Sequence, residues 1–268
     1  MSAYDALAAA GGVVVLGLLF LAETRAPLRA RVRPRGERLA VNGAVAVLAM
    51  LVVRLAVVPV GIAVASAAQR HRFGVLHWVG APPVAAWVVG VLLLDYTMYV
   101  WHRLNHRVPL LWRFHLVHHT DLDLDVATAL RFHAGELLLS CGWRAAQMAA
   151  IGPPVALVIV FEMVFEAATA FHHSNWRLPE ALDRALARLV VTPRVHGIHH
   201  STLEGETNSN WSVVLTWWDW LHRTLRLERP VAVPLVIGLP AYREPLGVGA
   251  LLTLPFRRQR PAWPPATS

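Results

Sequence analysis

The sequence contains one cysteine and few charged residues, and each of these shortages excludes a class of site or of protein. Its 268 residues include one cysteine, Cys141, so an internal disulfide and a four-cysteine zinc or iron–sulfur site are both impossible. Only 16% of the residues are charged, against about 25% in an average soluble domain. Hydrophobic residues make up 56% of the chain, and the mean hydropathy is +0.45. This composition argues against a soluble globular protein and a disordered one, and it favours a membrane protein.

Several catalytic signatures are also missing. The motif H-E-x-x-H, which puts two zinc ligands and a general base on one helix, does not occur, and this disfavours a membrane metalloprotease. The nucleophile elbow G-x-S-x-G of serine hydrolases is absent as well. No haem, flavin or iron–sulfur motif is visible, so any electrons that the protein uses are expected from a separate donor.

Four apolar blocks are candidate membrane spans, because a helix of about 20 apolar residues crosses the hydrocarbon core of a bilayer. They are Leu7–Ala22, Leu39–Ala68, Pro82–Trp101 and Leu137–Phe171. Gly152-Pro153-Pro154 interrupts the last block and predicts two helices joined at that turn, because Gly and Pro break helices. The start of the chain lacks the basic segment of a signal peptide, so we expect an uncleaved first helix. The prediction is an all-α integral membrane bundle of about four spans, the last a hairpin if it crosses, with a cytosolic histidine-rich helical cap.

The basic residues predict the orientation of this bundle. Six arginines lie between positions 25 and 38, in the connection between the first two apolar blocks. Loops rich in Arg and Lys stay in the cytoplasm, so this loop and residues 102–136 and 172–230 are predicted to be cytoplasmic. The protein is then a multi-pass protein of the cell or inner membrane. Nucleic-acid binding is disfavoured, because the arginines flank apolar spans and no known reading motif is present.

Histidine is abundant and patterned, with 14 residues, twelve of them between positions 102 and 222. One H-x-x-x-H and two H-x-x-H-H clusters occur, and residues three or four apart share a helix face, so each cluster is expected to aim its imidazoles at one point. Imidazole suits Zn, Cu, Fe and Ni, and a closed zinc site takes four ligands, so eight such histidines predict two metal ions. Open coordination positions on such a pair suit oxygen chemistry.

These clusters and their surroundings resemble the fatty acid hydroxylase/sterol desaturase superfamily. The resemblance rests on DYTMYVWHRLNHRVPLLWRFHLVHHTD from Asp95 onward and on residues 127–136, 171–175, 192–201 and 217–224. It implies an integral membrane oxygenase, with a histidine-bound di-iron site that activates O2 and hydroxylates or desaturates an aliphatic C–H bond of a lipid. The chain is accordingly divided into membrane helices over 1–90, a catalytic domain over 91–230 and a tail over 231–268, whose apolar, basic composition predicts a surface-lying segment.

The resemblance further implies a set of metal-binding histidines. They are His102, His106, His115, His118, His119, His133, His173, His196, His199 and His200. His133 is included as a ligand or near-ligand, whereas His172 is treated as a neighbour of the site. His222 is left out, and His71 and His77 are treated as ordinary surface residues.

Polar residues near these clusters are candidates to support the metals, because metal-bound histidine commonly donates its other N–H to a carboxylate. Asp95, Tyr99, His102 and His106 follow a 4-3-4 spacing and share one helix face. The four non-histidine residues assigned to the catalytic site are Asp95, Tyr99, Glu136 and Asn175. Asp125 is a candidate of the same kind, and the alternative for these carboxylates is a structural salt bridge with Arg103, Arg113 or Arg131. Asn210 and Asp219 are expected to be structural hydrogen bonders.

The predicted function is therefore that of a membrane-bound, O2-dependent oxidoreductase with two iron ions, although zinc competes well for imidazole sites in purified protein. Its expected partners are a lipid substrate from the bilayer and a separate redox protein, since no residues remain for a fused cytochrome domain. The alternative is a membrane protein that binds or transports metal with the same histidines. Such proteins place polar ligands along a pathway within the spans, whereas these histidines collect beyond the span ends. An inactive scaffold is a weaker alternative.

Overall fold

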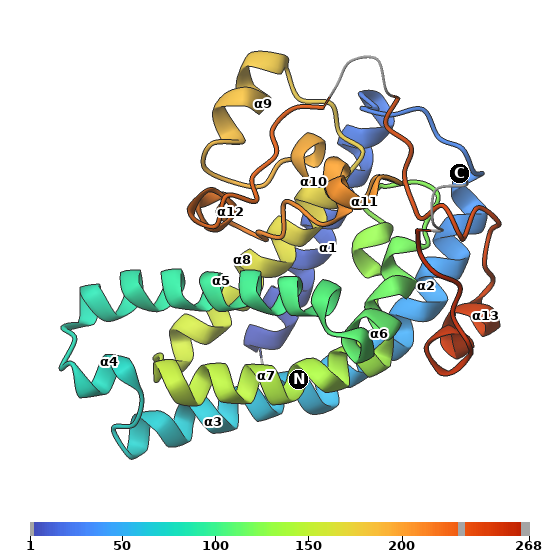
Figure 1. The fold of residues 1–268 in the computed structure, drawn as a ribbon. Helices are drawn as coiled ribbons and strands as arrows, with labels where there is room; N and C mark the ends of the chain where they lie inside the picture. Colours follow the sequence, from blue (N-terminus) through green and yellow to red (C-terminus); the bar gives the residue numbers. More distant parts are fainter. Residues whose placement is uncertain (1–2, 230–233, 264–268) are drawn as a thin grey trace.

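The computed structural model describes residues 3–229 and 234–263 (Figure 1). Within these ranges the chain is helical without any strand and has only isolated bridges such as Val190 with Leu215, as predicted. The helices are α1 (Ala3–Arg25), α2 (Arg35–Val52), α3 (Val58–Arg70), α4 (Val75–Trp78), α5 (Pro83–Arg107), α6 (Pro109–His119), α7 (Ala134–Ile151), α8 (Val155–His173), α9 (Glu180–Leu186), α10 (Pro193–His199), α11 (Glu204–Thr207), α12 (Trp217–Leu221) and α13 (Val248–Thr253).

Three helical stretches among the described residues are long and apolar enough to cross a membrane: Arg35–Trp78, Pro83–Arg107 and Val155–His173. They contain the second and third predicted blocks and the latter half of the fourth. The first predicted block lies within α1, which packs along α8. A π-helical turn at Val53–Val57 joins α2 to α3 just before Pro59, a residue that cannot donate a helical hydrogen bond.

Two helical hairpins turn at the same end of the molecule. One runs from α3 through α4 to α5, and the other joins α7 to α8 at Gly152, as the Gly-Pro-Pro motif predicted. Gly152 has a φ of 68°, the left-handed conformation that ends helices and favours glycine. A Cβ on Gly74 would lie 2.5 Å from the Gly152 nitrogen, so the two turns contact each other directly. The other ends of these helices lead to the histidines.

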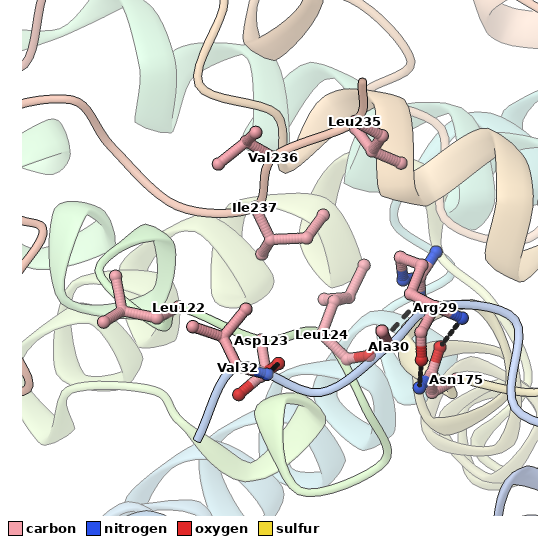
Figure 2. Close-up of a pocket in the computed structure, with 10 residues that line it drawn as sticks. All are labelled: Arg29, Ala30, Val32, Leu122, Asp123, Leu124, Asn175, Leu235, Val236 and Ile237. Carbon is pink, nitrogen blue, oxygen red and sulfur yellow. Dashed lines mark hydrogen bonds between the residues drawn. The ribbon is translucent and has the colours of Figure 1, made fainter.

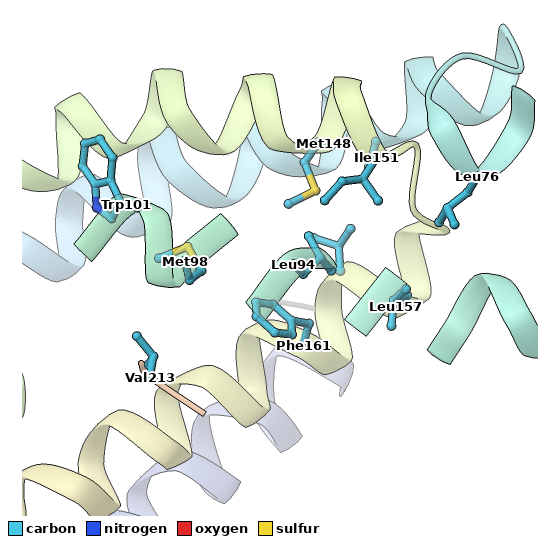
Figure 3. Packing of buried hydrophobic residues seen from close by; sticks show 11 residues of the cluster. Leu76, Leu94, Met98, Trp101, Met148, Ile151, Leu157, Phe161 and Val213 are labelled. Atoms are coloured by element: carbon cyan, nitrogen blue, oxygen red, sulfur yellow. The ribbon is translucent and has the colours of Figure 1, made fainter. Parts of the chain in front are cut away.

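Apolar side chains of α5, α7 and α8 form the core between the hairpins (Figure 3). Leu94 and Met98 of α5 lie against Met148 of α7 and Phe161 of α8, and all four are buried. Burial of such side chains stabilises a fold by about 1.5–3 kcal/mol each where water is the alternative. This core fixes the positions of α5 and α8, the two candidate spans that end in histidines.

The tail differs from the expectation of a surface-lying segment. Leu239, Tyr242 and Leu251 are buried against α2 and α6, and the Gly238 N–H donates to the His200 carbonyl at 2.9 Å. Residues 231–233 and 264–268 of the predicted tail lie outside the described residues. The part that is described covers the histidine-bearing helices, because its apolar side chains find buried partners there.

Candidate metal centre

Nine of the predicted histidines converge in two adjacent groups. The first group is His102, His106, His115, His119 and His199, and the second is His118, His173, His196 and His200. Within each group the candidate ligand nitrogens all lie within 4.8 Å of one another. Helices α5, α6 and α10 supply the first group, and α6, α8 and α10 with the residue after it supply the second.

The three histidines of each H-x-x-H-H cluster are divided between the two groups. This corrects the expectation that all imidazoles of one cluster point at the same metal position. His115 and His119 are four residues apart and share a face of α6, whereas His118 points to the other group. The second cluster divides in the same way, with His199 in the first group and His196 and His200 in the second. The two groups therefore share α6 and α10, and the imidazoles of His119 and His200 stack across them at 4.4 Å.

The nitrogen spacing in the second group fits ligands around one ion. The Nε2 atoms of His118 and His173 are 3.0 Å apart, and His196 Nε2 lies 3.1 Å from both His173 Nε2 and His200 Nε2. For imidazole–metal bonds of about 2.0–2.1 Å, nitrogens lie about 2.9 Å apart at a right angle and about 3.4 Å apart at a tetrahedral angle. The observed separations fall between these values.

Hydrogen bonds at the far side of several rings fix the tautomer that a metal requires. The Nδ1–H groups of His102, His173 and His199 donate to the carbonyls of residues 211, 169 and 209, at 2.8, 2.7 and 2.8 Å. A neutral imidazole with its proton on Nδ1 presents a lone pair at Nε2. His173 Nε2 thus has one lone pair facing two other Nε2 atoms, of which only one can donate a well-aligned hydrogen bond to it, whereas a shared cation could bind all three nitrogens.

Other nitrogens of the groups are buried without any hydrogen-bond partner. They include Nε2 of His106, His115, His119 and His199. Burial and then the neighbouring imidazoles lower the pKa of His119 well below its usual 6.5, and burial lowers the pKa of His199 to about 3. Neutral imidazole is the form that binds metal, and an orphaned buried nitrogen is costly without a partner. The residues present therefore fit two imidazole-bound metal ions.

Glu136 is the one predicted carboxylate that reaches the histidines. It lies in the first turn of α7, and its Oε1 accepts the Nδ1–H of His115 at 2.9 Å. The bond leaves His115 Nε2 facing the first group, as expected of a carboxylate that orients a metal-binding histidine.

Replacing Glu136 by glutamine is expected to weaken metal binding by about 10–100-fold, because the amide holds the His115 proton less strongly than a carboxylate does. Titration of metal-free protein with Fe(II) or Zn(II) measures this. The matched control is Glu162→Gln, which removes a carboxylate paired with Arg144 on α7 and α8 and should leave metal affinity unchanged. Equal affinities for Glu136→Gln and the wild type would contradict the role of Glu136.

The structure places the other three predicted catalytic residues away from both groups. Asp95 accepts hydrogen bonds from the backbone N–H groups of residues 214 and 215 and from the Trp218 indole, so it holds the loop before α12. The Tyr99 hydroxyl lies 3.3 Å from the Thr224 hydroxyl. The Asn175 side chain exchanges hydrogen bonds with the Arg29 backbone. Asp95 and Tyr99 share a helix face with His102, but neither side chain hydrogen-bonds to a histidine of either group. Their polar atoms instead bond to residues of the segment around α12.

His133, also predicted as a ligand, lies outside both groups. Its Nδ1 accepts the Gly135 N–H as the N-cap of α7, and its Nε2–H donates to the Leu252 carbonyl at 3.1 Å. Both ring nitrogens are thus occupied, and no lone pair remains for a metal. His172, expected to be a neighbour, donates from Nδ1 to the Val213 carbonyl, and its ring centroid lies 4.1 Å from that of His196.

Two arginines that the sequence assigned only to orientation support the metal centre. The Arg38 guanidinium is buried and bonds Asp121 and Asp125, directly after the histidines of α6. Asp125, a candidate for the metals, is therefore committed to a salt bridge, and its partner is not one of the three arginines considered. Arg29 donates to backbone carbonyls of residues 124, 174 and 193. Arg29, Asn175 and Leu124 line a small pocket of about 110 Å³ (Figure 2), and Asn175 follows His173 closely in the chain.

Comparison with known proteins agrees with this geometry. Residues 87–224 match the family model for fatty acid hydroxylase. The chain is 30% identical over 199 residues to ornithine lipid hydroxylase OlsE of Rhizobium tropici, which covers 74% of this chain and 59% of the relative. It is 32% identical to a cholesterol 25-hydroxylase-like protein of Danio rerio (52% of this chain, 54% of the relative). It is also 26% identical to alkylglycerol monooxygenase of Homo sapiens (55% and 32%).

The chain thus spans about half the length of the curated relatives it matches, and no solved structure matches it. The family match begins within α5, ends just after α12 and contains all nine grouped histidines. Because this match covers more than half of the chain, the protein belongs to the fatty acid hydroxylase family.

Proposed function

We propose that the protein is a membrane-bound oxidoreductase that uses two iron ions and O2 to hydroxylate an aliphatic C–H bond of a lipid. The observation that carries the proposal is the convergence of nine histidines in two adjacent groups, several of whose buried ring nitrogens have no hydrogen-bond partner and are placed to bind a cation. The family match and relatives named for hydroxylation of ornithine lipid and cholesterol support a lipid substrate.

The residues of the metal centre and the helices that carry them have separate roles in this function. Bound iron would supply the activation of O2, which no side chain provides. The histidines hold the ions, Glu136 orients His115, and the backbone carbonyls that accept Nδ1–H bonds keep other rings in the binding tautomer. Helices α5 and α8 carry ligands at the ends of candidate membrane spans, so a lipid in the bilayer is the substrate within reach.

We infer that the metal centre faces the cytoplasm. Arg29 and Arg38 belong to the arginine-rich segment before and at the start of α2, and both contact the histidine-bearing region directly. The segment and the site therefore share one side of any membrane that the helices cross. Excess arginine marks the cytoplasmic side.

The metal-transport alternative finds less support in this geometry. Several ligand rings are locked by bonds at their far nitrogens, and the described tail packs over their helices. A fixed, covered site suits catalysis better than passage of an ion.

The test is to express the chain in a membrane host and compare lipid extracts with and without it by mass spectrometry. Hydroxylation adds about 16 Da, one oxygen atom, to a lipid, whereas desaturation removes about 2 Da. We expect a lipid with the larger shift and about two metal ions per chain after anaerobic purification. Protein loaded with about two iron ions that changes no lipid in the presence of O2 and a chemical reductant would overturn the proposal.

A further inference from the structure

A pair of stacked indoles links the first histidine group to the outside of the protein. The Trp112 ring centroid lies 5.0 Å from that of His106 and 5.6 Å from that of His119. Trp263 from the tail stacks on Trp112, with centroids 5.8 Å apart and an interplanar angle of 24°. The Trp263 indole N–H donates to the Thr202 carbonyl at 3.1 Å, which fixes the ring in place. Both tryptophans are half-buried, so ring contacts continue from the histidines to the surface.

Positive charge surrounds the outer end of this stack. Arg113, next to Trp112 on α6, donates to backbone carbonyls of the tail, including that of Arg257. Arg257, Arg258 and Arg260 precede Trp263 and are exposed. A carboxylate, Glu244, pairs with Arg260 at 2.6 Å, which leaves a clear excess of arginine. We call these four arginines and the two stacked tryptophans the Trp263 surface.

We propose that the Trp263 surface docks an acidic one-electron carrier protein and that the Trp263–Trp112 stack conducts its electrons to the metal centre. This inference rests on the proposed function, because hydroxylation with O2 consumes two electrons that the chain itself does not supply. In each encounter the reduced carrier loses one electron and the oxidised metal centre gains it, and no covalent bond forms or breaks. Two encounters supply one turnover.

The location favours a protein carrier over a lipid surface. Trp263 packs on Trp112 of α6, and Figure 1 shows α6 and α13 at the side of the molecule opposite α4 and the turn between α3 and α5. The Trp263 surface therefore lies far from that end of the candidate spans. Complementary charge speeds the encounter of two proteins and makes it sensitive to salt, which is the behaviour expected here.

Docking is tested with the full-length protein in nanodiscs and a plant-type [2Fe–2S] ferredoxin as the acidic carrier. We expect the double variant Arg257→Glu/Arg258→Glu to weaken binding by about tenfold or more at low salt and to flatten its salt dependence. The matched control, Arg184→Glu/Arg188→Glu, makes the same charge change on and just after α9 and should bind like the wild type. Metal-free protein should bind equally well, because surface charge determines docking.

Two results would overturn the docking surface. One is unchanged ferredoxin binding by Arg257→Glu/Arg258→Glu; loss of binding to anionic phosphatidylglycerol vesicles by the same variant would then assign the arginines to lipid. The other is an equal loss of ferredoxin binding in the Arg184→Glu/Arg188→Glu control, which would show that the position of the charges does not matter.

The conducting role is tested by stopped-flow reduction of the iron-loaded protein. At saturating ferredoxin, where any change in affinity no longer limits the rate, we expect Trp263→Leu to slow reduction by ferredoxin by an order of magnitude or more, while reduction by dithionite stays as in the wild type. Trp263→Phe keeps an aromatic ring and should retain much of the rate, which separates conduction from packing of the tail. Unchanged reduction by ferredoxin in Trp263→Leu would overturn the route.

The carrier site and the proposed hydroxylase function can be tested separately. Lipid hydroxylation driven by dithionite and O2 needs no carrier. Hydroxylated product under those conditions, without docking at the Trp263 surface, would refute the carrier site alone.

Discussion

Replacing His196 by alanine is expected to abolish lipid hydroxylation and to lower bound metal from about two ions per chain to about one. His196 Nε2 lies 3.1 Å from two other ring nitrogens of the second group, so its loss removes the central ligand of that ion. The first group keeps all five of its histidines. Metal analysis of the purified variant and mass spectrometry of its lipids measure the two effects.

The control for this experiment is His133→Ala. The sequence placed His133 among the ligands, but both of its nitrogens are occupied by backbone groups. We expect this variant to keep its full metal content, with a modest loss of stability from the missing N-cap of about 0.5–2 kcal/mol. Loss of one metal ion in His133→Ala, or full metal content in His196→Ala, would contradict the ligand assignment.

Replacing Arg38 by methionine is expected to lower the free energy of unfolding by about 3–5 kcal/mol, since removal of one partner leaves buried carboxylates without compensation. Arg38 bonds Asp121 and Asp125, and all three side chains are buried. Burial raises the pKa of Asp121, but Arg131 and Arg38 outweigh it and hold that pKa at about 2. Both carboxylates lie in the segment that follows the last histidine of α6, so the variant should also bind metal less tightly.

Thermal and denaturant unfolding in detergent measure this loss, and Arg33→Met is the control. Arg33 lies just before α2 and pairs with the exposed Glu37 in its first turn, and an ion pair in contact with solvent contributes about 0–1 kcal/mol. Adding Asp121→Asn to Arg38→Met should recover part of the stability, because it removes one unpaired charge. Equal stability of Arg38→Met and Arg33→Met would show that the buried network does not hold the histidine helix.

Much of the site could be predicted because the type and spacing of its residues indicate metal binding. Histidines three and four apart must share a helix side, and two such clusters predict two ions. The division of each cluster between the groups could not be read from spacing, since it depends on where α5, α8 and α10 approach α6. Glu136 was predicted from its proximity to the histidine clusters in the sequence, and it does bond to His115. Asp95 and Asn175 were predicted in the same way, but their side chains bond to backbone groups instead.

Hydropathy, helix breakers and periodicity are local properties, so the helical membrane architecture, the turn at Gly152 and the nine converging histidines could be predicted from the sequence alone. Tertiary structure decided which residues serve each metal group, that His133 serves neither, and that Arg29 and Arg38 support the site. It also brought the tail onto the histidine helices, with Trp263 against Trp112. These contacts join residues far apart in the chain, and their partners are set by packing and by the need to satisfy buried polar groups.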